Sequence, residues 1–117
     1  MFSLGQDPRW RNRMVDGLDI VSGASVLDIA AGTGSITRLL QQGGAAVVSL
    51  DQSAEMLADA VARGATGVLA TAEKLPFPDE SFDAATFGYL LRYVKDVEGS
   101  MGEIARVLRR GGSVGMV

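Results

Sequence analysis

The chain has 117 residues, the length of a single compact domain with one core. Its 11 lysines and arginines against 14 aspartates and glutamates give a net charge of −3, which argues against a general nucleic-acid surface. The absence of cysteine and histidine excludes disulfides, thiolate sites and the usual general base. Any chemistry must therefore use carboxylates, Arg, Lys, Tyr, hydroxyls or a cofactor. No apolar run approaches the roughly 18–20 residues that span a bilayer, so we expect a cytoplasmic protein.

Short apolar runs alternate along the chain with segments of helical periodicity, and glycines or polar turn residues separate them. In chain order they predict a helix at 7–18, a strand at 25–29, a turn at 30–34, a helix from Ser35 to the glycines at 43–44, a strand at 46–50 ending at Asp51, a helix at 53–63, a strand at 66–70, a loop at 73–81, a strand at 82–87, a helix at 89–95, a helix at 96–109 and a strand at 113–117. Residues 1–117 are expected to form one domain, with an N-terminal helix in 1–23 and the core in 24–117.

Helical periodicity also predicts which side chains face the core. The expected inward positions are Met56, Leu57 and Ala60 in the helix at 53–63, and Met101, Ile104, Ala105 and Leu108 in the helix at 96–109. A Gly-Gly pair at 111–112 is expected to end that last helix. Strands that alternate with crossover helices indicate an α/β protein with a parallel sheet, whose ligands bind at the carboxyl ends of the strands.

A glycine turn follows the first strand. Gly32 and Gly34 allow a tight turn and a close approach of the backbone to a ligand. A dinucleotide fingerprint would require a third Gly or Ala where Thr37 stands, and the Gly-Lys-Ser/Thr of a P-loop is missing. Asp28 at the strand end would repel a pyrophosphate but attract a cationic group such as an ammonium. The alternative interpretation is a simple turn between a strand and a helix.

Asp51 closes the second strand, at a place where an acidic residue accepts both hydroxyls of a ribose. The alternative is a charge that stabilises the N-terminus of the helix beginning at Ser53, and both roles can hold together. Carboxylates at two adjacent strand ends, without phosphate-binding features, suggest a nucleoside with a cationic tail. S-adenosylmethionine fits that description.

Four segments in this order resemble class I S-adenosylmethionine-dependent methyltransferases. Residues 26–34 (VLDIAAGTG) resemble motif I, and residues 50–57 (LDQSAEML) resemble the ribose and adenine segment. Residues 72–83 (AEKLPFPDESFD) and 104–112 (IARVLRRGG) resemble the loop with the fourth strand and the last crossover helix with its turn. The resemblance implies a Rossmann-like sheet of order 3-2-1-4-5 with helices on both faces, here without the C-terminal antiparallel hairpin of complete members.

Two further segments, residues 4–11 (LGQDPRWR) and 91–94 (LRYV), are similar to the ubiquinone and menaquinone biosynthesis C-methyltransferases. This similarity implies methyl transfer to a small molecule, with a quinone precursor as the candidate. It places Arg92 beside the substrate, where its charge would stabilise a phenolate, and Tyr89 would line the pocket or relay a proton. The alternatives are a surface arginine and a packing aromatic ring.

The same resemblance implies S-adenosylmethionine as cofactor, S-adenosylhomocysteine as product, and no metal. The expected cofactor contacts are Asp28, Ala30, Gly32, Thr33, Gly34, Asp51, Gln52, Met56, Thr71, Ala72, Glu73, Phe87 and Gly88. Thr71 stands where the wider group often has an Asp that holds the adenine amino group, and a neutral hydroxyl should hold that group more weakly.

The alternative function is a cofactor-binding module without independent catalysis, which needs a partner chain to complete its substrate site. Nucleic acid is not the expected substrate, because residues 88–90 lack the Asn/Asp-Pro-Pro-Tyr/Phe of nucleic-acid amino-methyltransferases. The predicted strand at 113–117 holds no charge or proline to protect its edge. We therefore expect a homodimer, or a larger assembly, joined there or through the helix at 96–109, and the alternative is a monomer with a frayed end.

Overall fold

The computed structural model describes residues 22–29, 35–87 and 96–116. In chain order its elements are β1 (Ser25–Ile29), α2 (Ser35–Gln42), β2 (Ala46–Asp51), α3 (Ala54–Ala62), β3 (Thr66–Leu69), β4 (Phe82–Phe87), α5 (Val97–Val107) and β5 (Leu108–Met116). The predicted helices at 7–18 and 89–95 and the turn at 30–34 lie outside the described residues. Within the described part, every predicted strand and each of the other helices is present.

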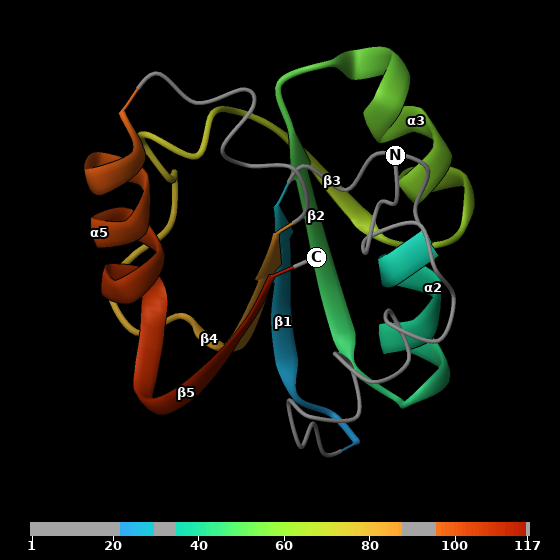
Figure 1. Ribbon diagram of the computed structural model, residues 1–117. Coiled ribbons are helices and arrows are strands. Elements are labelled where there is room, and N and C mark those ends of the chain that lie inside the picture. The colour runs from blue at the N-terminus through green and yellow to red at the C-terminus, as the bar shows by residue number, and fades with distance from the viewer. Residues whose placement is uncertain (1–21, 30–34, 88–95, 117) are drawn as a thin grey trace, which may run out of the picture.

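The strands form one sheet of order β3-β2-β1-β4-β5, and all four neighbouring pairs are parallel. Helices α2 and α3 cover one face of the sheet and α5 covers the other (Figure 1). The expected α/β architecture, with this strand order and helices on both faces, is therefore confirmed. None of the helices in the described residues has the length and apolar character required to cross a bilayer.

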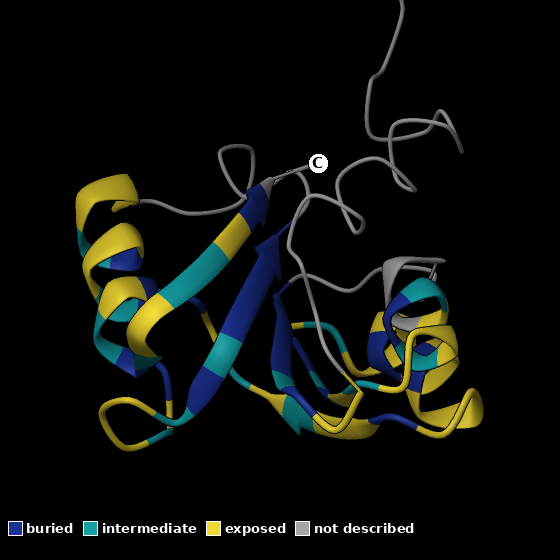
Figure 2. Ribbon diagram, turned by 90° about the horizontal axis from the view of Figure 1, so that it is seen from below, coloured by how far each residue is buried: buried dark blue, intermediate teal, exposed yellow. Residues whose placement is uncertain are grey.

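The central strands β1 and β4 are almost completely buried (Figure 2). Their alternating side chains belong to two separate cores, one on each face of the sheet. On the α5 face, Leu27 and Ile29 of β1 pack with Ile104 of α5. On the other face, Val26 packs with Leu40 of α2. Because the strands are buried on both sides, they read in the sequence as nearly continuous apolar runs.

Helix α3 begins at its predicted cap. The Ser53 hydroxyl accepts a hydrogen bond from the Met56 N–H at 3.4 Å, which satisfies one of the free amides at the helix start. Leu57 and Ala60 are buried as predicted, but Met56 is 42% exposed, so its predicted inward position is wrong. Helix α3 packs on β3, at the edge of the sheet, and on its neighbour β2. Only Leu57 and Ala60 of the helix are buried in this contact.

The last helix ends two residues earlier than predicted. Helix α5 stops at Val107, and Leu108 is already the first residue of β5, where it pairs with Phe82. The buried face of α5 consists of Ser100, Ile104 and Val107, whereas Met101 and Ala105 are exposed. Of the predicted inward positions, Ile104 is buried and Leu108 packs against the same core from β5 rather than from the helix, whereas those of Met101 and Ala105 are wrong.

The Gly-Gly pair at 111–112 lies inside β5 rather than at a helix end. The register passes from Phe82–Leu108 to Ala84–Ser113, so β5 bulges out against one residue of β4. Gly111 has a φ of +79°, a conformation that ordinary L residues rarely adopt. A Cβ on Gly112 would lie 3.0 Å from the Asp83 carbonyl oxygen, so β4 and β5 approach each other too closely there for a side chain.

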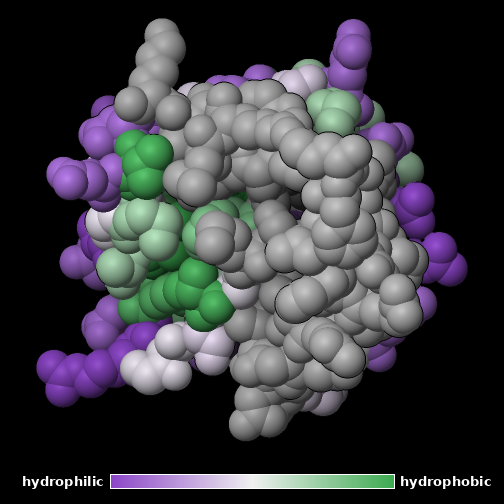
Figure 3. All heavy atoms as spheres, in the orientation of Figure 1, coloured by the Kyte–Doolittle hydropathy of each residue, from purple (hydrophilic) through white to green (hydrophobic). Residues whose placement is uncertain are grey.

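The edge strand β5 differs from its prediction in one further respect. It begins five residues earlier, at Leu108, and therefore contains Arg109 and Arg110, so the expectation of a strand without charge is wrong. Exposed apolar side chains also lie on this side of the molecule, from Val97 and Met101 of α5 and Val114 of β5 (Figure 3). The homodimer through this edge stays a prediction.

Candidate functional site

The carboxyl ends of four strands meet at the same edge of the sheet, the upper edge in Figure 1. Ile29 at the end of β1 pairs with Leu50 of β2 and with Phe87, the last residue of β4. Asp51, the last residue of β2, pairs with Leu69 at the end of β3. The register therefore brings the described residues of the expected site to one edge, as the strand-end rule predicts.

Asp28 lies one residue before the end of β1 and is only 2% exposed. Its Oδ1 accepts a hydrogen bond from the Thr86 hydroxyl at 2.9 Å. Ser49 of β2 and Thr86 of β4 are its register partners on either side, and both are completely buried. The carboxyl group of Asp28 is thus the centre of a polar row that crosses three strands.

Sequence reasoning missed Ser49 and Thr86. The signal that identifies them is their spacing in the strands: Ser49 comes two residues after Val47, and Thr86 two residues after Ala84. Val47 and Ala84 belong to the core on the α2 face. Asp28 follows Val26 by the same interval, so all three polar residues continue an apolar face toward the ligand edge. A buried polar group is stable only when it is hydrogen-bonded, which explains why a hydroxyl faces the carboxyl group.

Asp51 is half-buried, and its Oδ1 accepts a hydrogen bond from the Ser53 N–H at 2.9 Å. This bond gives Asp51 the structural role that the sequence offered as an alternative, next to the start of α3. A carboxylate has about four acceptor positions, so the same side chain can also accept from a ligand. Gln52 follows Asp51 directly and Met56 lies in the first turn of α3, and both are exposed.

The segment after β3 is joined to the end of β2, because the Ala70 N–H donates to the Asp51 carbonyl at 3.0 Å. The expected adenine contacts follow at once: Thr71 is exposed, Ala72 is buried and Glu73 is half-buried. Phe87 is 3% exposed and belongs to the core on the α5 face. A contact of Phe87 with a ligand would therefore come from its main chain.

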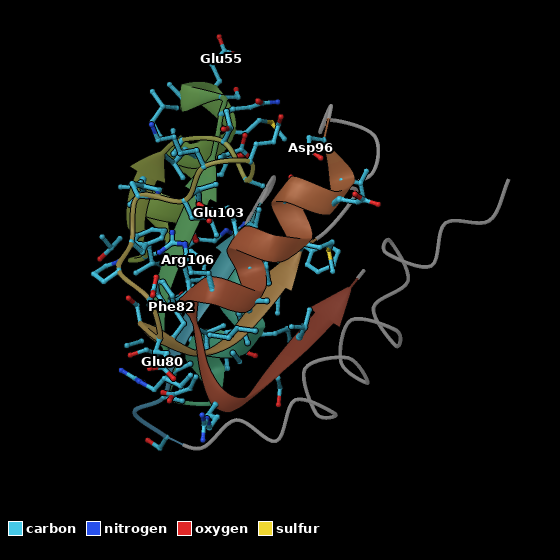
Figure 4. All side chains as sticks on the ribbon, turned by 90° about the vertical axis from the view of Figure 1, so that its left-hand side faces the viewer. Glu55, Glu80, Phe82, Asp96, Glu103 and Arg106 are labelled. Carbon is cyan, nitrogen blue, oxygen red and sulfur yellow. The ribbon has the colours of Figure 1, made fainter. Side chains whose placement is uncertain are left out.

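The loop between β3 and β4 is fixed to α5 by Glu103 and Arg106 (Figure 4). Glu103 accepts a hydrogen bond from the Leu75 N–H at 2.8 Å, and Arg106 donates to the Leu75 carbonyl at 3.0 Å. The hydrogen bond from Arg106, together with that from the Leu75 N–H, lowers the pKa of Glu103 below its usual 4.5. The bonds to Glu103 and Asp79 raise the pKa of Arg106 above its already high value. Sequence reasoning did not assign these two residues a role.

Seven expected site residues lie outside the described residues. They are Ala30, Gly32, Thr33 and Gly34 of the glycine turn, and Gly88, Tyr89 and Arg92 after β4. Their roles stay predictions. In the part of the chain that the structure describes, no group of three or more acidic residues is arranged to hold a metal ion.

Comparison with known proteins agrees with this fold. A model of the methyltransferase domain family matches residues 27–116. The demethylmenaquinone methyltransferase of Mycolicibacterium paratuberculosis is 45% identical over 112 residues, which are 96% of this chain and 49% of that protein. The chain therefore spans about half the length of the curated relatives it matches.

Solved structures show the same likeness. The S-adenosylmethionine-dependent methyltransferase of Mesorhizobium loti superposes with a TM-score of 0.79 at 33% identity, over 94% of this chain and 53% of that one. A complex between the Haloferax volcanii Trm112 methyltransferase activator and a methyltransferase gives 0.83 at 28% identity, over 94% and 53%. The chain belongs to the methyltransferase domain family, and the resemblance to class I S-adenosylmethionine-dependent methyltransferases is confirmed.

Proposed function

We propose that the protein transfers a methyl group from S-adenosylmethionine to a small molecule and releases S-adenosylhomocysteine. The observation that carries the proposal is the edge of the sheet where Asp28, Asp51 and the segment after β3 converge, in a chain of the methyltransferase family. Fold alone does not establish an activity. The residues at this edge therefore provide the test.

The described residues fit the two ends of this cofactor. Asp51, at the end of β2, would accept from the ribose hydroxyls, while Thr71, Ala72 and Glu73 would border the adenine. Asp28, one residue before the end of β1, would provide a carboxyl group on the side of the cationic methionine portion. When bound, S-adenosylmethionine supplies the methyl group from its sulfonium, and the protein supplies position and a site that excludes water.

The finer proposal is a quinone precursor as methyl acceptor. It is supported by the relative from Mycolicibacterium paratuberculosis, whose name states that substrate, and by its 45% identity to this chain. Arg92 would stabilise the phenolate form of the ring, and Tyr89 would line the pocket or relay a proton. For both residues, the proposal rests on the family resemblance.

Binding of S-adenosylhomocysteine by calorimetry tests the cofactor proposal. Asp51→Asn keeps an oxygen for the Ser53 N–H bond but removes the charge that would face the ribose. It should lose about 1.5–3 kcal/mol of binding, or roughly 10–150-fold in affinity. Asp59→Asn is the matched control, because Asp59 lies on the exposed surface of α3 and undergoes the same change of charge. Equal affinity in the folded Asp51→Asn and Asp59→Asn proteins would reject the placement of the ribose.

Transfer of a labelled methyl group to a panel of demethylquinones tests the acceptor. Turnover by the chain alone supports the enzyme, and Arg92→Ala should then lower the rate while leaving cofactor affinity nearly intact. Cofactor binding without turnover would favour the cofactor-binding module, and addition of a candidate partner chain would then be the next measurement. Loss of cofactor binding in Arg92→Ala would contradict its place on the substrate side.

A further inference from the structure

The loop from Ala70 to Ser81 connects the ligand edge of β3 to the start of β4 and is fixed in its middle, at Leu75. The side chain of Leu75 is 4% exposed and belongs to the core on the α5 face, as does Ala72. Between them the chain makes a turn, closed by a hydrogen bond of 3.3 Å from the Lys74 N–H to the Thr71 carbonyl. The position of Thr71 therefore depends on how Leu75 is held.

Both main-chain groups of Leu75 are held by one pair of side chains on α5. Its N–H donates to Glu103 Oε1 at 2.8 Å, and its carbonyl accepts from Arg106 Nη2 at 3.0 Å. Arg106 Nε also donates to Glu103 Oε2 at 2.7 Å, so the carboxylate fixes the plane of the guanidinium. A planar fork whose two sides bind different acceptors is a geometry that only arginine provides.

The other side of the fork fixes the rest of the loop. Arg106 Nη1 donates to the Phe77 carbonyl at 2.8 Å and to Asp79 Oδ1 at 2.9 Å. The Phe77 ring then packs edge-to-face on Phe82, with ring centres 5.0 Å apart, which ties the loop to the first residue of β4. Arg106 thus joins three points of a loop that has no strand or helix of its own.

We propose that Arg106, oriented by Glu103, is a positioning residue for the adenine end of the cofactor site. The inference rests on the proposed function, since it assumes that Thr71, Ala72 and Glu73 border the adenine. Arg106 does not itself contact the ligand in this proposal. It fixes Leu75, and through the turn from Thr71 to Lys74 it fixes the groups that would recognise the base.

The test compares two ligands that differ only at the base. S-adenosylhomocysteine carries a 6-amino group, which would donate to a carbonyl or carboxylate oxygen in residues 71–73. S-inosylhomocysteine carries a 6-oxo group there, which cannot donate. The ratio of their affinities measures how well the adenine contact is positioned. General loosening of the protein would weaken both ligands and leave the ratio unchanged, so the ratio separates positioning from mere stability.

The variants are Arg106→Gln and its control Arg109→Gln, which removes the same charge. Arg109 pairs with Asp83 at 2.6 Å at the amino end of β4, the end of the sheet opposite the ligand edge. Arg106→Gln should lower the affinity ratio by about 2- to 12-fold, the range for loss of one ordinary hydrogen bond. Arg109→Gln should keep the wild-type ratio. Thermal melting followed by circular dichroism identifies a temperature at which both variants are folded, and the affinities are measured there.

Arg106→Lys provides a second variant, which keeps the charge without the planar fork, and it should lose the discrimination as well. Wild-type ratios in Arg106→Gln or in Arg106→Lys would overturn the inference while leaving the proposed function intact. A wild-type protein that binds neither ligand would overturn both. A wild-type protein that binds both ligands equally would show that the adenine amino group is not recognised, and would overturn this inference alone.

Discussion

The hydrogen bond between Thr86 and Asp28 makes a prediction that requires no ligand. Thr86→Val keeps the shape of the side chain and replaces only the hydroxyl by a methyl group. The bond of 2.9 Å joins two side chains that are 0% and 2% exposed, so water cannot take the place of the lost donor. Loss of one partner of a buried polar pair costs about 1–3 kcal/mol.

Thermal or urea unfolding measures this loss directly. For a domain of this length, 1 kcal/mol corresponds to roughly 4 °C in Tm, so Thr86→Val should melt roughly 4–12 °C below the wild type. Thr86→Ser is the control, because it keeps the hydroxyl and deletes only the methyl group, at about 0.5–1.5 kcal/mol. The expected order of stability is therefore threonine, then serine, then valine.

Packing alone predicts the reverse order for the two variants, with valine more stable than serine. Valine fills the same volume as threonine and favours strands, whereas serine leaves a small void. A valine variant that equals the wild type and exceeds the serine variant would refute the reasoning about the polar row. It would also remove the reason to regard Thr86 as the residue that holds the Asp28 carboxyl group.

Three further predictions concern stability. Ile104 is a core residue, 1% exposed, so Ile104→Ala should lower the free energy of unfolding in urea titration by about 2–5 kcal/mol. Met101 is 40% exposed, and Met101→Ala should change the same free energy by well under half of that amount. Glu80 has a φ of +54°, so Glu80→Asn should raise the unfolding free energy by up to about 1 kcal/mol in the same assay, and a decrease would contradict this. The pKa of Glu103 is lowered in the folded state, so its contribution to stability is present above the usual 4.5 and is lost as the pH falls through the folded pKa. Glu103→Gln should therefore flatten the acid side of a plot of unfolding free energy against pH. An unchanged acid profile in that variant would assign the slope to other groups, such as Asp83, whose pKa is lowered by the Ser25 N–H and then by Arg109.

The strands and helix caps could be predicted because their signals are local. The strand at 25–29 is a short apolar run between polar turns, and Ser53 begins a helix by capping it, so each needed only its neighbours in sequence. The end of α5 was not predictable in this way. Leu108 continues the helical repeat seven residues after Met101, but pairing with Phe82 26 residues earlier in the chain makes it a strand residue. Tertiary contact overrode the local pattern there.

The candidate site shows the same division. The places of Asp28 and Asp51 follow from the rule that ligands bind at strand ends, which requires only the element order. The partners of these residues do not follow from it. Thr86 stands in an apolar run where a hydroxyl is unremarkable, and Glu103 with Arg106 has the spacing of an ordinary surface ion pair on a helix. Only the folded chain shows that one side chain binds a buried carboxyl group and that the pair holds a loop.

The strand order has a consequence for how the protein folds. β1 lies between β2, which follows it closely in the chain, and β4, and the Thr86–Asp28 bond joins residues separated by 58 positions. The pairing of β1 with β2 closes a short loop, whereas its pairing with β4 closes a long one at greater entropic cost. In a nascent chain in which only β1 to β3 have formed, β1 is still an open edge of the sheet, and Asp28 lacks the hydrogen bond from Thr86. Pairing with β4 therefore turns this open edge into the centre of the sheet, and in the same step it supplies the hydroxyl partner of Asp28.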